Sequence, residues 1–339
     1  MRVGPVGVLV RPRAGVAGLV VAVALLGVAG VAVFSGSLDI APARVLAALA
    51  GDGTRVETLV VVDRRLARTL AAVLVGFALG CAGALTQSIT RNPIASPDIL
   101  GVTTGAGFFA VLLITHPALL PGGSAMLAAA AITGGLVTTG GILALSWRAG
   151  FDGLRLILVG ISVNAIGMAG VSWLLLRTDI DQAAVAMRWL TGSLSGARMP
   201  DVLLLAPFVL AAGLACAYLA RDLAALRLGR SVAPALGTAP GRTEALALLV
   251  AVVLASGATA VAGPVAFAAF VAPQAAMRLF GTAGPPPLAG GLTGALLILA
   301  ADLTAQRLPA ELPVGVVTAV VGAPFLLYLL HRHRRRTSV

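Results

Sequence analysis

The sequence predicts an all-α integral membrane protein with about ten transmembrane helices and both termini in the cytoplasm. Of its 339 residues, 59% are hydrophobic and 11% are charged, whereas soluble domains carry about 25% charged residues. The mean hydropathy is +1.01, and the apolar residues fall in runs long enough to cross a bilayer. This composition excludes a soluble globular enzyme, a disordered chain and a coiled coil.

Ten apolar segments have about the length of 20 residues that a helix needs to cross the hydrocarbon layer. The first is longer than the apolar core of a signal peptide, about 7–15 residues, so we expect an uncleaved helix. The eighth follows Gly263-Pro264 and contains Pro273, so we expect a tilted or partial span. The segments are residues 14–34, 66–87, 99–120, 124–146, 156–176, 202–220, 245–262, 264–280, 288–306 and 312–330.

The arginines support this topology. All 24 basic residues are arginine, and ten spans with inner termini place 15 of them but only four acidic residues in the cytoplasm. The whole net charge of +11 then lies inside, as the positive-inside rule requires, and no nucleic acid is needed to explain it. We therefore expect a single transmembrane domain over residues 1–339, with a cytoplasmic segment 1–13, a membrane core 14–330 and a cytoplasmic basic tail 331–339.

Small residues recur at four-residue spacing inside two of the segments. Gly76, Gly80 and Ala84 share one helix face, as do Gly290 and Gly294. Such spacing lets helix backbones approach closely in lipid. We interpret it mainly as packing within the chain, with a subunit interface or a pore lining as the alternative.

Sequence patterns of a catalytic site are missing. There is no Walker A motif, no Gly-x-Ser-x-Gly and no His/Glu metal spacing. Cys81 and Cys216 are too few for a disulfide framework or a thiolate metal site. Asp302 is the main acidic residue within a span, whereas ion-coupled carriers usually bury several carboxylates. This argues against a secondary carrier without removing it, because backbone carbonyls also bind sodium.

Longer motifs resemble the FecCD family of ABC-importer permeases, which take up ferric siderophores, haem and cobalamin. They occur in the family's order over nearly the whole chain. Four stretches are most similar to the catecholate-siderophore branch: Gln182–Ala184, Trp189–Leu194, Pro273-Gln274 and Ala283–Pro286. The family motifs are Arg65–Thr69, Gly83–Gln87, Arg91–Val102, Ala262–Phe267, Val271–Gln274, Glu311–Thr318 and Gly322–Phe325.

The resemblance implies a permease subunit in the cytoplasmic membrane of a bacterium, surrounded by lipid. It implies a second permease, which we expect to be a different chain, two cytoplasmic ATPases and an extracytoplasmic substrate-binding protein. The chain itself would bind no cofactor, because the ATPases use the ATP. The expected cargo is a ferric siderophore, with a catecholate favoured. The alternatives are a haem or cobalamin permease, then a secondary carrier, and last a membrane enzyme.

The resemblance also assigns residues at the outer mouth. Arg65 and Arg68 match the family's arginines that receive acidic side chains of the docked binding protein. An arginine fork binds carboxylates through two hydrogen bonds. Arg307 lies beside Gln306, which takes the spacing of a third family arginine. The alternative for the first pair is snorkelling, or an ion pair with Asp63.

At the inner side, the resemblance implies a cytoplasmic gate. Asn92 and Ile94 would form one layer, and Gly153 and Leu154 the other. An apolar constriction of this kind can gate by excluding water. The alternative for Asn92 is a plain turn stabilised by its side chain.

A cytoplasmic, glycine-bounded segment from Leu226 to Gly237 matches the place where the family puts its ATPase-coupling helices. Packing of such a segment against the ATPase converts closure of the ATPases into tilting of the permease. In this chain Arg230 follows Leu228-Gly229, where relatives often have acidic residues. The alternative is a solvated loop. The candidate contact residues are Leu226, Leu228, Gly229, Leu236 and Gly237.

Overall fold

The computed structural model describes residues 12–116, 123–146, 153–308 and 312–337. Within these ranges the chain forms helices and turns and no strand, which confirms the all-α prediction. Ten helices occupy the positions of the ten predicted spans. They are α1 (Pro12–Phe34), α4 (Ala67–Thr90), α5 (Val102–Thr115), α6 (Gly123–Ser146), α7 (Gly153–Leu176), α9 (Met199–Arg227), α10 (Pro240–Ala262), α11 (Ala268–Phe280), α12 (Pro287–Arg307) and α13 (Val314–Thr337).

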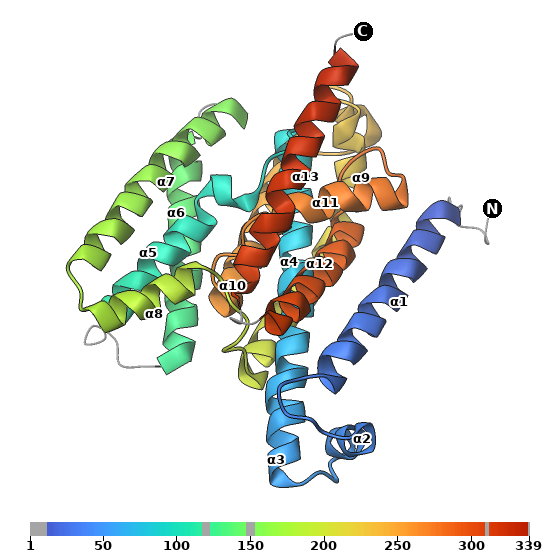
Figure 1. The fold of residues 1–339 in the computed structure, drawn as a ribbon. Coiled ribbons are helices and arrows are strands. Elements are labelled where there is room, and N and C mark those ends of the chain that lie inside the picture. Colours follow the sequence, from blue (N-terminus) through green and yellow to red (C-terminus); the bar gives the residue numbers. More distant parts are fainter. Residues whose placement is uncertain (1–11, 117–122, 147–152, 309–311, 338–339) are drawn as a thin grey trace.

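Not all of these helices cross the bilayer in the same way. Seven of the described helices are long and apolar enough to span it, while α5 and the part Val314–Leu329 of α13 are apolar but shorter. Helix α11 has 13 residues, about 20 Å at 1.5 Å per residue, which is less than the roughly 30 Å hydrocarbon layer. Figure 1 shows it lying across α13. The expected partial span is therefore confirmed.

Helix α4 lies in the middle of the bundle (Figure 1). It packs against α9, α10, α11 and α12, and most of its residues are buried. Helices α5, α6, α7 and α8 (Ile180–Leu190) form a neighbouring layer, and α1 packs against α12. Helix α4 is therefore the central helix, and the others pack around it.

The two stripes of small residues pack against each other. A Cβ atom placed on Gly76 would lie 2.3 Å from the carbonyl oxygen of Gly294, and one placed on Gly80 would lie 2.1 Å from that of Gly290. Real Cβ atoms do not approach an oxygen so closely, so only glycine permits this contact between α4 and α12. The interpretation as packing within the chain is confirmed.

The segment between the first two predicted spans contains helices. Helix α2 (Pro42–Ala50) and the single turn α3 (Arg55–Thr58) lead into a π-helical segment, Leu59–Leu66, that continues into α4. Thr54 caps α3 and its partner Glu57 accepts a hydrogen bond from the Thr54 backbone. This Thr-x-x-Glu capping box was present in the sequence as a helix-start signal, and our prediction missed it.

The described ends of α1 and α13 lie on the same half of the molecule, opposite α2 and α3 (Figure 1). An even number of crossings brings the two chain ends to one side. The arrangement therefore agrees with the expected even number of spans.

Substitution Gly80→Val tests the contact between α4 and α12. We expect it to lower stability by roughly 1–3 kcal/mol or more, because overpacking forces the two backbones apart. The measurement is thermal unfolding of the purified protein in detergent. The matched control is Gly27→Val on α1, where a Cβ meets nothing within 4 Å. Equal melting temperatures for the two variants would contradict the proposed role of the contact.

Candidate functional site

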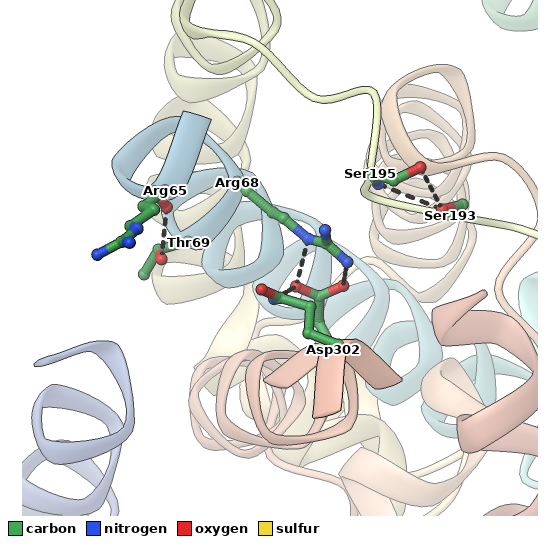
Figure 2. A network of polar contacts seen from close by, with 7 residues as sticks. Arg65, Arg68, Thr69, Ser193, Ser195 and Asp302 are labelled. Atoms are coloured by element: carbon green, nitrogen blue, oxygen red, sulfur yellow. Dashed lines mark hydrogen bonds and ion pairs between the residues drawn. The ribbon is translucent and has the colours of Figure 1, made fainter. Parts of the chain in front are cut away.

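At the N-terminal end of α4, Arg68 forms a two-pronged ion pair with Asp302 of α12 (Figure 2). Its Nε and Nη2 atoms each lie 2.9 Å from a carboxylate oxygen of Asp302. The Asp302 side chain is only 2% exposed and that of Arg68 is 20% exposed. Gln306 donates a further hydrogen bond of 2.8 Å to the same carboxylate. The partner of Arg68 is thus Asp302 and not Asp63.

Arg65 lies one turn earlier and points elsewhere (Figure 2). Its guanidinium donates hydrogen bonds to the carbonyl oxygens of Val33 and Leu38, at the end of α1 and just beyond it. Thr69 donates to the backbone carbonyl of Arg65 at 2.7 Å. Both predicted docking arginines of this motif therefore have partners within the chain.

Arg307 ends α12 and is exposed. Arg64, next to Arg65, is also exposed, and the sequence analysis did not single it out. The sequence identifies Asp302 as the main acidic residue within a span, but it does not identify the partner of this carboxylate. A buried carboxylate in a span needs a cation nearby, and this rule predicts an arginine partner for Asp302 without identifying which one.

The predicted gate residue Asn92 lies in the turn after α4. Its side-chain oxygen accepts a hydrogen bond of 3.1 Å from the backbone N–H of Ile94. Arg91 before it has a positive φ of 52°, and Ile94 is 45% exposed. The turn is thus stabilised by asparagine chemistry and presents an apolar side chain. Gly153 and Leu154 begin α7, and the surroundings of these two residues lie outside the described part of the structure.

The same loop is tied to α7 further along. Asn164 of α7 donates a hydrogen bond of 3.0 Å to the carbonyl oxygen of Asp98. Ser96 donates to the Asp98 carboxylate at 3.1 Å, while burial raises the pKa of this carboxyl above its ordinary value. The two segments predicted to form the gate are therefore linked through Asp98 and Asn164.

The predicted coupling segment begins in the last turn of α9 and continues beyond it. Leu226 is buried, whereas Leu228 and Leu236 are 66% and 57% exposed. Gly229 and Gly237 take positive φ angles of 131° and 80°, which let the chain turn sharply on each side of the short helix Ala233–Leu236. The structure thus presents apolar side chains on a compact turn and not on an extended loop.

Two arginines fasten this segment to the rest of the bundle. Arg91 donates a hydrogen bond of 3.3 Å to the carbonyl oxygen of Leu226. Arg227 donates one of 2.6 Å to that of Pro285, in the turn before α12. A displacement of the segment would therefore be transmitted to α4 and α12.

Three of the sequence motifs meet at the end of the bundle that carries Arg68 and Asp302 (Figure 2). The backbone N–H of Ser193 donates to the carbonyl oxygen of Ala262 at 2.7 Å, and that of Gly315 donates to Gly192 at 3.1 Å. Gly192 and Gly263 both have positive φ angles, 73° and 69°. The glycines of these motifs are explained by this close crossing of loops.

Among the described residues, no group of three or more His, Cys, Asp or Glu side chains lies close enough to hold a metal ion. Cys81 and Cys216 are both buried and neither forms a disulfide. The Sγ–H group of Cys81 donates to the carbonyl oxygen of Pro287. Both cysteines therefore act as small core residues on α4 and α9.

Comparison with known proteins gives consistent matches. The model of the FecCD transport family matches residues 20–332. A ferric enterobactin transport permease of Escherichia coli (strain K12), FepG, is 42% identical over 306 residues, which cover 89% of this chain and 91% of the relative. A second ferric enterobactin permease of that strain, FepD, is 37% identical and covers 86% of this chain and 87% of its own. An achromobactin transport permease of Dickeya dadantii (strain 3937) is 37% identical, covering 93% of this chain and 89% of its own.

A solved structure has a similar fold. It is a metal-chelate type ABC transporter in an inward-facing conformation, with a TM-score of 0.81 and 25% sequence identity. The match covers 94% of this chain and 99% of the other. The similarity therefore extends over the whole bundle.

Substitution Asp302→Asn tests the ion pair at the outer mouth. We expect a loss of about 3 kcal/mol in stability, because the partly buried Arg68 would keep its charge without a counterion. The double variant Arg68→Gln/Asp302→Asn should recover part of this loss. Unfolding in detergent measures all three variants against the parent. Additive losses, with no recovery in the double variant, would show that the pair does not act as a unit.

Proposed function

The chain belongs to the FecCD transport family, and on that premise we propose that it is the permease subunit of an ATP-driven importer of a ferric siderophore. The observation that carries the proposal is the 42% identity to a ferric enterobactin permease over nearly the whole of both chains. The match of the bundle to a metal-chelate transporter supports it. Within this class we propose a catecholate cargo, as the motifs Gln182–Ala184 and Trp189–Leu194 indicate.

The permease would work with a second, different permease subunit, two cytoplasmic ATPases and an extracytoplasmic binding protein. Two ferric enterobactin permeases of one Escherichia coli strain are each similar to this chain, at 42% and 37% identity. A pair of related but distinct permeases is the simplest explanation for such a set. ATP would be bound by the ATPases, and the chain itself would carry no cofactor.

For the binding protein, we propose docking at the outer mouth through Arg307. This side chain is exposed at the end of α12, where its fork can bind a carboxylate of the partner. Arg65 and Arg68 have partners within the chain. Their part in docking would be to hold the mouth in shape and to add positive potential.

For the cytoplasmic gate, we propose that Ile94 and Leu154 supply apolar layers, positioned by Asn92 and Gly153. The support is the hydrogen bond from the Ile94 backbone to Asn92, in a turn that leaves Ile94 exposed, and the hydrogen bond from Asn164 of α7 to Asp98. A ring of such side chains from two permeases would close the pathway by excluding water.

For coupling, we propose that the exposed leucines of the turn after α9 pack on the ATPase. Leu228 and Leu236 would enter an apolar groove, and Leu226 would anchor the turn to the core. Gly229 and Gly237 allow its shape. Movement would then pass through Arg91 and Arg227 into the bundle, as a rigid-body switch.

Uptake in proteoliposomes tests the transport proposal. The chain would be reconstituted with its partner permease, ATPase and binding protein, and given labelled ferric catecholate or haem. We expect catecholate uptake that depends on internal ATP. At low concentrations of binding protein, Arg307→Glu should reduce uptake roughly tenfold, because it opposes acidic groups of the partner.

The charge-preserving variant Arg307→Lys is the control, and excess binding protein should rescue Arg307→Glu. Uptake of haem alone would overturn the cargo but keep the importer. Uptake driven by an ion gradient without ATP would overturn the importer itself.

The coupling proposal has its own test. We expect Leu236→Ala to leave assembly intact but to reduce ATP-dependent uptake at least fivefold, because an apolar contact with the ATPase is lost. Leu46→Ala is the matched control, since Leu46 on α2 has the same exposure of 57% at the opposite end of the molecule. Equal effects of the two variants on uptake would reject the assignment.

A further inference from the structure

An apolar groove runs along α6 and α10, apart from the residues assigned above to docking and to the gate. Its first part has a volume of about 240 Å³ and is lined mainly by apolar residues such as Leu136, Leu143 and Leu248. A second part of about 140 Å³ shares Leu136 and continues between α6, α9 and α10, past Phe208. Several of these side chains are exposed, Leu136 by 39% and Leu249 by 57%. The groove therefore opens onto the surface of the bundle.

The length of the first part matches one leaflet of a bilayer. Its lining on α10 runs from Gly241 to Val252, which is about 16 Å at 1.5 Å per residue. Half of the hydrocarbon layer is about 15 Å. An acyl chain entering at the start of α10 would therefore follow the groove to the middle of the membrane.

Glycines keep this groove open. Gly140 and Gly241 line it, and a Cβ on either would meet nothing within 4 Å. Gly76 and Gly80 are different, since the approach of another backbone requires them. A side chain at Gly140 or Gly241 would extend into the groove without meeting protein, so glycine at these two positions leaves the groove its full width.

The cytoplasmic end of the groove carries charge. Arg230 lies there, with its Nη2 atom 3.2 Å from a carboxylate oxygen of Glu244. The Arg230 side chain is 45% exposed and that of Glu244 is 8% exposed. Exposed Arg242 lies in the same first turn of α10, whose N-terminal dipole adds positive potential. Arg91 also acts electrostatically on Glu244, while the Asp222 carboxylate accepts a hydrogen bond from Thr243 of this turn. Three arginines against two carboxylates leave this end positive.

We propose that the groove binds one anionic phospholipid of the cytoplasmic leaflet. The phosphate would lie on Arg230, whose fork offers five donors and can contact a carboxylate and a phosphate together. One acyl chain would lie along α6 and α10 across Gly140. Glu244 would hold Arg230 at the groove's end. An apolar channel with a positive end at the cytoplasmic side is the pattern that anionic lipids recognise.

Native mass spectrometry of the purified importer tests this proposal. The complex would be exchanged into detergent with equal amounts of phosphatidylglycerol and phosphatidylethanolamine. We expect phosphatidylglycerol to be retained roughly fivefold over phosphatidylethanolamine. Gly140→Phe should reduce the retained phosphatidylglycerol about fivefold, because the ring fills the groove. Arg230→Gln should abolish the preference while some lipid stays bound.

The matched control is Gly141→Phe. This neighbour on α6 also meets nothing within 4 Å, but it does not line the groove, so lipid retention should be unchanged. Equal retention of both lipids by the parent, or equal effects of the two phenylalanines, would overturn the proposal. If Gly140→Phe does not fold, an unchanged lipid preference in Arg230→Gln would overturn it instead. A cross-link from Leu249→Cys to another subunit would show that protein covers the groove.

Discussion

The close contact between α4 and α12 is the constraint on which the rest of the bundle depends. In lipid no hydrophobic force drives one apolar helix against another, so helices associate by close packing and by interhelical hydrogen bonds. Gly76 and Gly80 let the backbone of α4 touch that of α12, and Gly83 does the same against Ala269 of α11. Larger residues at these positions would move α12 and α11 outward, and with them the helices that pack on both.

Polar links reinforce this core along its length. At the outer end stands the ion pair of Arg68 and Asp302. Deeper in, Gln274 of α11 donates to the side chain of Gln87 at 2.8 Å, and Gln87 donates to the carbonyl oxygen of Phe270. Thr293 of α12 donates to Ala272 at 2.9 Å. Most residues of α11 are buried among the neighbouring helices, where no water can satisfy a polar group, so the buried polar groups there find partners within the chain.

The rigid core connects the proposed functional regions. One end of α4 carries the outer arginines, and the other leads into the turn of Asn92 and Ile94. Arg91, at the end of α4, also binds the last turn of α9, next to the proposed coupling segment. A helix that is packed along its whole length moves as a rigid body more readily than it bends, as the proposed coupling to an ATPase requires.

The sequence by itself determined the class of protein, the positions of the ten helices and the short eighth span, because these follow from apolar run length and from the placement of arginine and proline. It also singled out the glycine stripes at Gly76 and Gly290. Only the tertiary structure decided that these stripes face each other, that Arg68 is paired with Asp302, and that Arg65 binds carbonyl oxygens beyond α1. The glycine contacts and the ion pair join residues more than 200 positions apart. Arg65 and Arg68 lie one helical turn apart and yet contact different helices. Local spacing holds no information about them, because they depend on which helix faces lie together once the bundle has packed.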